Sequence, residues 1–458
     1  MSELKGLRGS PGLLDNRGPL CSLYQRLLAD PDGESNKLSD DLLRQQLEVI
    51  RNDCSQLPEH PGQLMSWVER NCTAVALEYC CYLKARQQGG ARRYFRNRAH
   101  ALYFLQGVAP TKQVDGAWLY GVLEHWQDHR YDGLIITYLE ELGDGEPTQN
   151  HVAIYRRLLV EFGCDSNVGL PDELFLQGTI QLALGQCARN YMPEVLGYNL
   201  GYEQLPLHLL ISAYELAELG IDPYYFSLHV TIDNASTGHA HRAVQGVLEL
   251  MPRGMDGDRF WQRVQQGYRL NNVGPGSIAV IQSFDLEAEL VRMLERKSPF
   301  GQHMHSDYCR FEGKSVNQWL AHPVQIPAFL QALQGKGWIV RHQNPTDSRF
   351  WHLIEGAGAA MFGVFSGLEK QLLHDWIAGD WSSQQRVIPV RRGPLTECSP
   401  LPNQVEDPET QVLRTALANE PVEREFALLL PWLGPQRHHR PAGLFATRRF
   451  IELRARLG

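Results

Sequence analysis

The residues best suited to chemistry lie in residues 221–243, where His229, Asp233, His239 and His241 interrupt a run of small and apolar residues. Imidazoles and carboxylates are costly to bury unless they share a partner, which favours a metal site. On one helix, His229 and Asp233 would project from the same face, one turn apart. His239 reaches that face only if the helix loosens just before it, where poor helix formers and a glycine permit a break. A polar turn with solvated histidines explains the stretch equally well.

A second candidate pair, Glu141 and His151, flanks the Gly-Asp-Gly-Glu-Pro segment at residues 143–147. The glycines and the proline predict that one helix ends near Glu141 and that another begins at about Thr148, with His151 in its first turn. Such a reversal can bring the two side chains together. Ordinary surface turn chemistry is the alternative interpretation.

Further carboxylates lie on both sides of this pair. Asp115 stands at the head of an aromatic, otherwise apolar segment, where it is either a helix N-terminal acid or an inward ligand. Glu194 and Glu203 are nine residues apart, so on a straight helix they face opposite sides, and we expect Glu203 to be the inward one. Glu215 and Glu218 are predicted to be exposed acids.

The first half of the chain predicts helices that would position these groups. A capped amphipathic helix is expected to begin at Ser39, and residues 62–85 predict a helix that is apolar over much of its circumference and therefore buried. Residues 92–107 predict a third helix, whose pattern Pro110 interrupts.

The second half is less regular. Residues 337–341 predict a short strand, and residues 387–408, rich in proline and polar groups, predict a linker. The adjacent His438 and His439 lie in a predicted loop between two short helices, where we expect them to be solvated.

Composition sets limits on function. The chain of 458 residues has room for two or three domains, and its net charge of −8 argues against nucleic acid as a partner. Nine cysteines without a Cys-x-x-Cys pair indicate a reduced compartment and neither an iron-sulfur cluster nor a structural zinc. The chain shows no signal-peptide core and no apolar run of about 18 residues, so we expect a cytoplasmic protein without a membrane span.

The assembled pattern resembles the heme-oxygenase-like diiron oxidases and oxygenases. That family has a Glu followed ten residues later by a His, which matches Glu141 and His151, with a carboxylate about 26 residues earlier that falls on Asp115. Its Tyr-Phe-x-x-His-x-x-x-Asp helix falls on His229 and Asp233. The resemblance covers about residues 90–245.

Two further family positions are matched less closely. The compact family form has Asp-x-x-His, whereas five residues separate Asp233 from His239 here, so His241 remains an alternative final ligand. The helical Glu that lies upstream of the family's His falls on Glu203, with Glu194 in reserve. The ligand set implied by the resemblance is Asp115, Glu141, His151, Glu203, His229, Asp233 and His239.

The resemblance implies a mainly α protein with a seven-helix bundle, an N-terminal arm and a mixed α/β C-terminal extension. It implies two Fe(II) ions, with manganese as the alternative, and dioxygen as co-substrate. Oxygen and nitrogen donors without thiolates suit those metals. The implied reaction is N-oxygenation, desaturation or carbon-carbon cleavage of an amino acid or an amino-acid-derived small molecule in a biosynthetic pathway.

The resemblance also implies a homodimer and leaves room for an external electron donor. We predict an arm at residues 1–38, the diiron domain at 39–255, the mixed extension at 256–386, and a linker with terminal helices at 387–458. Two alternatives remain open: a metal-independent or heme-binding protein of the same fold, and a non-catalytic helical interaction protein.

Overall fold

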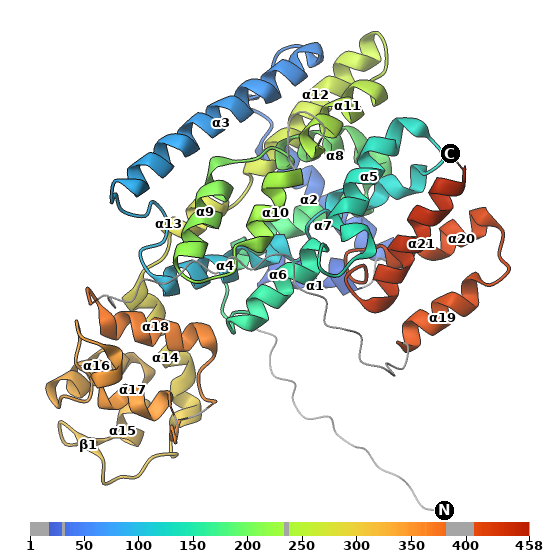
Figure 1. Ribbon diagram of the computed structural model, residues 1–458. Coiled ribbons are helices and arrows are strands. Elements are labelled where there is room, and N and C mark those ends of the chain that lie inside the picture. The colour runs from blue at the N-terminus through green and yellow to red at the C-terminus, as the bar shows by residue number, and fades with distance from the viewer. Residues whose placement is uncertain are drawn as a thin grey trace, which may run out of the picture.

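The computed structural model describes residues 18–29, 33–232, 238–356, 358–361, 363–381 and 407–457. These residues are mostly helical, which confirms the predicted mainly α fold (Figure 1). Within the described ranges, the only β-structure is the antiparallel pair β1 (Arg310–Phe311) and β2 (Lys314–Ser315). None of the helices in these ranges is both long and apolar enough to cross a bilayer.

The central bundle surrounds a buried aromatic core that includes Trp118 and Tyr198. Its close packing depends on small residues at helix crossings, because a Cβ on Gly267 would lie 2.0 Å from the carbonyl oxygen of Glu194. The helices of this bundle are α4 (Arg98–Lys112), α5 (Asp132–Glu141), α6 (His151–Glu161), α7 (Leu176–Gln186), α8 (Ala188–Tyr202), α9 (Leu207–Glu218), α10 (Tyr224–Ile232), α11 (His239–Leu250) and α12 (Met255–Arg269).

Two N-terminal helices, α1 (Pro19–Ala29) and α2 (Gly33–Val49), pack on α7. The predicted helix start at Ser39 is wrong, because α2 already begins at Gly33. Ser39 is fully buried inside α2, and its hydroxyl donates to Oε1 of Gln186 at 2.9 Å. A tertiary contact therefore uses the hydroxyl that the sequence assigned to capping.

Helix α3 (Leu64–Gln87) corrects a second expectation. A helix forms there as predicted, but it is not buried: it lies along an edge of the bundle in Figure 1, and the Leu77 side chain is 64% exposed. Only Leu64, Val68 and Tyr82 of this helix are buried. The apolar residues are spread around the circumference, so one helix face cannot cover them all.

The expectation that Glu215 is exposed is also wrong. Its carboxylate is fully buried and accepts hydrogen bonds from the Tyr82 hydroxyl at 2.7 Å and from the backbone N–H groups of residues 93–95. These contacts hold residues 93–95 outside a helix, so α4 begins at Arg98, after the N-cap Asn97, and not at Arg92. Helix α4 then continues through Pro110 to Lys112.

A second helical unit follows the bundle and meets it at α4 through α13 and α18. The strand predicted at residues 337–341 is absent from this described segment, because its carbonyls and N–H groups bond to helix ends. The N–H of Phe350 donates to the Trp338 carbonyl. The helices of the unit are α13 (Ser277–Gln282), α14 (Leu286–Gly301), α15 (Val316–Leu320), α16 (Ile326–Gly335), α17 (Arg349–Ile354) and α18 (Gly367–Ala378).

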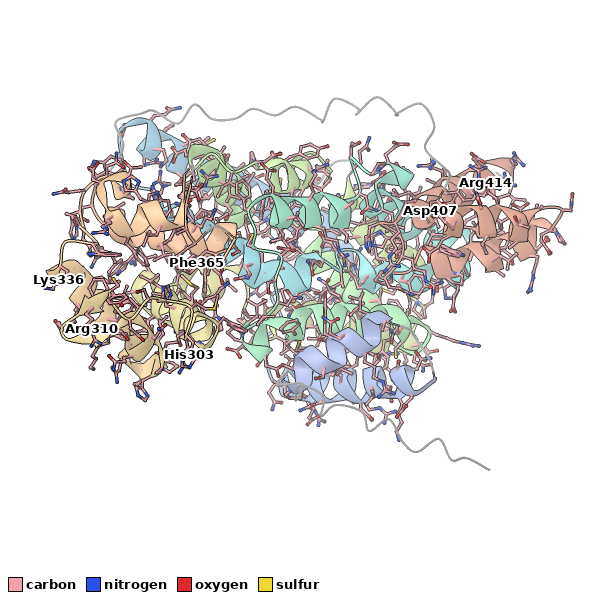
Figure 2. All side chains as sticks on the ribbon, turned by 90° about the horizontal axis from the view of Figure 1, so that it is seen from below. His303, Arg310, Lys336, Phe365, Asp407 and Arg414 are labelled. Atoms are coloured by element: carbon pink, nitrogen blue, oxygen red, sulfur yellow. The ribbon has the colours of Figure 1, made fainter. Side chains whose placement is uncertain are left out.

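The last three helices, α19 (Pro408–Leu417), α20 (Val422–Leu429) and α21 (Pro441–Leu457), pack on the opposite end of the bundle. Figure 2 shows Asp407 and Arg414 at this end and His303, Arg310 and Lys336 at the other. The C-terminal helices share the core of the bundle: the Trp126 and Phe426 rings stack with centroids 3.9 Å apart. The division of the chain into four domains stays a prediction.

Candidate metal centre

The reversal predicted between Glu141 and His151 is present. Glu141 is the last residue of α5 and His151 is the first residue of α6, which begins three residues later than Thr148. Gly143 has a φ of +63°, and a Cβ there would lie 2.3 Å from the Asn150 nitrogen. The turn therefore requires glycine, and it directs both Glu141 and His151 into the bundle.

Asp115 lies between α4 and the 3-10 helix η2 (Ala117–His125). It is not a helix N-terminal acid on the surface, because its side chain is fully buried. The next residue, Gly116, has a φ of +78°, and a Cβ there would approach the Glu141 Cβ to 2.9 Å. The glycine thus allows the Asp115 loop to pass against the helix that carries Glu141.

His229 and His239 lie on separate helices. Helix α10 ends at Ile232, and His239 is the first residue of α11, directly after its N-cap Gly238. The helix is therefore broken before His239, as its inclusion in a shared site requires. Asp233 lies outside the described residues. His241 is only partly buried and belongs to neither of the groups described next.

Six of the seven predicted residues converge in two buried groups that share Glu141. In each group one nitrogen or oxygen of every member lies within 4.8 Å of the others. The first group consists of Asp115, Glu141, His151 and His229, and the second of Glu141, Glu203 and His239. Their role as ligands stays a prediction.

The shared carboxylate faces both groups with different oxygens. Oε2 of Glu141 lies 2.5 Å from Nδ1 of His151, whereas Oε1 lies 3.4 Å from Nδ1 of His239. Nδ1 of His239 is also 3.0 Å from Oε2 of Glu203. In the first group, Nε2 of His229 lies 3.4 Å from Oδ2 of Asp115. Glu141 therefore contacts residues of both groups.

In two of the histidines, the ring nitrogen that points away from the group contacts a neighbouring oxygen. Nδ1 of His229 donates to the Tyr225 carbonyl at 2.8 Å, so Nε2 faces the group. Nε2 of His239 lies 2.8 Å from Oε2 of Glu140, which also binds Arg242. Metal-binding histidines are commonly oriented in this way by a carbonyl or a carboxylate.

Glu140 received no role from the sequence patterns, although a signal was present. Arg242 lies three residues after His239, on the same side of α11, and a partly buried guanidinium requires an anionic partner. The other carboxylate in question, Glu194, pairs with Arg263 at 2.6 Å and turns away from the groups. The structure therefore brings Glu203, and not Glu194, to the centre.

Opposite charges within the two groups shift the pKa values of their members. Burial would raise the pKa of Glu141, but the adjacent His151 lowers it to about 2. Burial would lower the pKa of His151, but Glu141 and Asp115 raise it to about 10. Burial would also raise the pKa of Asp115. Lys112, together with His151 and His229, instead holds this pKa well below its usual range. The neighbouring carboxylates and imidazoles thus stabilise each other's charged forms.

The donor set fits a metal of the iron or manganese type. Within the described residues, Oδ1 of Asp115 is among the buried side-chain atoms that make no hydrogen bond. Such atoms are rare in proteins and require an explanation, for which a cation is suited. The two groups offer carboxylate oxygens and imidazole nitrogens and include no cysteine, which favours iron or manganese over a structural zinc.

His438 and Asn150 form a buried contact behind this centre. His438 is 1% exposed, and its Nδ1 accepts from Nδ2 of Asn150 at 3.0 Å, so the expectation of a solvated histidine pair is wrong for His438. The same Asn150 amide donates to the Leu142 carbonyl, and its Oδ1 accepts from the N–H of Ala153. No local sequence pattern links residue 438 to residue 150.

Comparison with known proteins agrees with this site. Residues 102–272 match the heme-oxygenase-like family described as iron-containing redox enzymes, and this segment contains the whole predicted ligand set. The match confirms the resemblance over this segment of the helical bundle. Comparisons with curated proteins and with solved structures gave no match.

Proposed function

We propose that this protein is a non-heme diiron oxidase or oxygenase that uses dioxygen to oxidise a small organic molecule. The observation that carries the proposal is the pair of buried groups joined by Glu141, whose two oxygens face His151 and His239. One iron would be held by the group with Asp115 and the other by the group with Glu203. When bound, the two irons would supply the redox equivalents and the binding place for dioxygen.

The protein's own residues would fix this centre and limit its access to water. Glu140 holds the ring of His239, and the Tyr225 carbonyl holds the ring of His229. The Tyr225 hydroxyl donates to Oδ2 of Asp115 at 2.5 Å, which orients that carboxylate toward the first group. All six described residues of the two groups are buried, so the centre is shielded from bulk solvent.

The wider assignment follows from the family resemblance. We propose an amino-acid-derived substrate in a biosynthetic pathway, a cytoplasmic location, and a homodimer that can draw electrons from an external donor. The match to iron-containing redox enzymes supports a redox enzyme over a structural helical protein.

Anaerobic titration with Fe(II), followed by a rapid pulse of oxygen, tests the proposal. We expect uptake of about two irons per chain and a transient visible absorbance after the pulse. The heme-binding alternative predicts uptake of heme and no uptake of free iron. A protein that takes up neither metal nor heme would be a metal-independent or non-catalytic member of the fold, and the proposal would be wrong.

A further inference from the structure

A cavity of about 510 Å³ leads from the surface at α3 to the metal centre. At its inner end it is lined by His229 and by Ala240, the residue after His239. Its walls are largely apolar and include Val108 of α4 and Phe226 of α10. The volume and the lining suit a small organic ligand.

One fixed charge faces this cavity. Lys112 is the only lysine or arginine among the described residues that line it, and no aspartate or glutamate lines it. The Lys112 Nζ donates to the Tyr202 hydroxyl at 2.9 Å and lies 4.0 Å from Oδ1 of Asp115. An ammonium group has three N–H donors, so donors remain for an acceptor inside the cavity.

Most other polar groups of the lining are already occupied. The Gln177 amide donates to the Leu270 and Val273 carbonyls, and the Asn271 amide donates to the Tyr198 and Tyr268 carbonyls. Their donors are thus satisfied by the protein itself. Recognition of a polar ligand therefore depends mainly on Lys112.

His208 lines the same cavity, and its pKa is lowered to about 4, first by burial and then by the charge of Lys112. It is therefore neutral at physiological pH and can form a hydrogen bond without adding charge. Among the described residues of the lining, a cationic ligand would find no anionic partner, and Lys112 would repel it.

Metal binding at the two groups would make the charge of Lys112 more available to an anionic ligand. Asp115, Glu141 and Glu203 carry three negative charges, and two divalent cations more than neutralise them. If Asp233 adds a fourth negative charge, the carboxylates and the two cations sum to zero, and the positive charge of Lys112 remains unbalanced. An anionic ligand would balance it.

We infer that this cavity binds a small monocarboxylate with an apolar body. The carboxylate would contact Lys112, and the carbon atoms next to the carboxylate would face the metal groups. Because it names the substrate class of the metal centre, the inference rests on the proposed function. The inference predicts that amino-acid-derived carboxylates bind better than free amino acids when their amino group is absent or masked.

Direct binding to the Mn(II)-loaded protein, measured by titration calorimetry, tests the inference without turnover. The probes share one chain length: octanoate, 1-octanol, octylamine and 2-aminooctanoate. We expect octanoate to bind about 10- to 100-fold more tightly than the other three probes. It alone has a carboxylate that can form a charge-assisted hydrogen bond and no ammonium group that Lys112 would repel. Equal affinity for octanoate and 1-octanol in the parent protein would overturn the inference.

Variants of two lysines locate the effect. Lys112→Met should lose the preference for octanoate while retaining the affinity for 1-octanol, and Lys112→Arg should keep the preference. Lys84→Met, on the exposed side of α3, is the matched control and should behave as the parent. A preference that survives in Lys112→Met would overturn the inference. If that variant does not fold, the comparison of probes on the parent and on Lys112→Arg decides.

The manganese content of each sample separates this inference from the proposed function. Two bound manganese ions without a preference for octanoate would overturn the inference and leave the metal centre in place. Absence of metal binding would overturn the proposed function. In that case a preference for octanoate in the metal-free protein would still support the cavity assignment, and its absence would reject both.

Discussion

The two sides of the metal centre are built differently. On one side, Glu141 and His151 lie at the ends of a glycine turn that is covered by the C-terminal helices: Asn150 binds His438, and Arg448 donates to the Gly145 carbonyl. On the other side, the cavity opens past Lys112 toward α3, which is largely exposed. Contacts with distant residues hold the closed side in place, whereas the open side borders a cavity.

The closed side depends on residues far apart in the chain. A Cβ at Gly145 would lie 2.6 Å from the Leu444 carbonyl oxygen, so the turn and α21 are in direct contact. The Tyr138 hydroxyl, one turn before Glu141, donates to the Leu433 carbonyl at 2.6 Å. A terminal segment of a protein can thus act as a support for a metal centre that contains none of its own residues.

The largest expected effect is the loss of metal in Glu141→Ala, because this residue belongs to both groups. We expect the affinity for Fe(II) or Mn(II) to fall by more than about 100-fold at both positions. Metal content after anaerobic loading and desalting measures this. Glu194→Ala, which removes an equally buried carboxylate paired with Arg263, should retain both metals. Loss of only one metal in Glu141→Ala would show that the carboxylate does not bridge.

Asn150→Ala should weaken the closed side. It removes the N-cap of α6 and leaves the Leu142 carbonyl and Nδ1 of His438 without their donor. We expect a loss of about 2–4 kcal/mol in the free energy of unfolding, measured with denaturant. Asn97→Ala, which removes only the N-cap bond of α4, should lose about 1 kcal/mol. Equal losses in the two variants would mean that the contact with His438 adds nothing.

Glu140→Gln should affect one metal position more than the other. The amide cannot form the charged contacts with His239 and Arg242, so the ring of His239 is held less firmly. We expect roughly a 10-fold lower affinity for one of the two metal equivalents, measured by titration. Glu249→Gln, on the exposed side of α11, is the control. An unchanged titration would contradict a positioning role for Glu140.

Acidification should destabilise the closed side through His438. Burial, with His439 and Arg156 nearby, lowers its pKa well below the usual value, so the folded state disfavours the protonated ring. The stability from this residue is therefore complete above its unfolded pKa of about 6.5 and is lost below it, by up to about 1.4 kcal/mol per pH unit. Denaturation of the metal-free protein at several pH values should show a smaller slope for His438→Gln than for the parent.

The smallest effect is expected on the open side. Leu77→Glu places a charge on the exposed surface of α3 and should change the free energy of unfolding by less than about 0.5 kcal/mol. Chromatography of the same variant tests the proposed homodimer. A large loss of stability, or a change from dimer to monomer, would show that a second subunit covers this helix.

The local parts of the centre could be predicted from residue patterns alone. The reversal between Glu141 and His151 follows from the Gly-Asp-Gly-Glu-Pro segment, since glycine alone readily adopts the required backbone angles. The break before His239 follows from poor helix formers in the same way. These features depend on neighbours in the chain, which a sequence displays directly.

Which polar groups are buried could not be predicted in this way, because burial follows from long-range packing. Glu215, expected to be exposed, accepts bonds from residues 93–95, and His438, expected to be solvated, binds Asn150 across the fold. Helix α3 was expected to be buried and is not. Burial depends on which distant segments pack together, and the chain order does not state those contacts. Local backbone preferences therefore determine the turns of this protein, whereas long-range packing determines which side chains surround those turns.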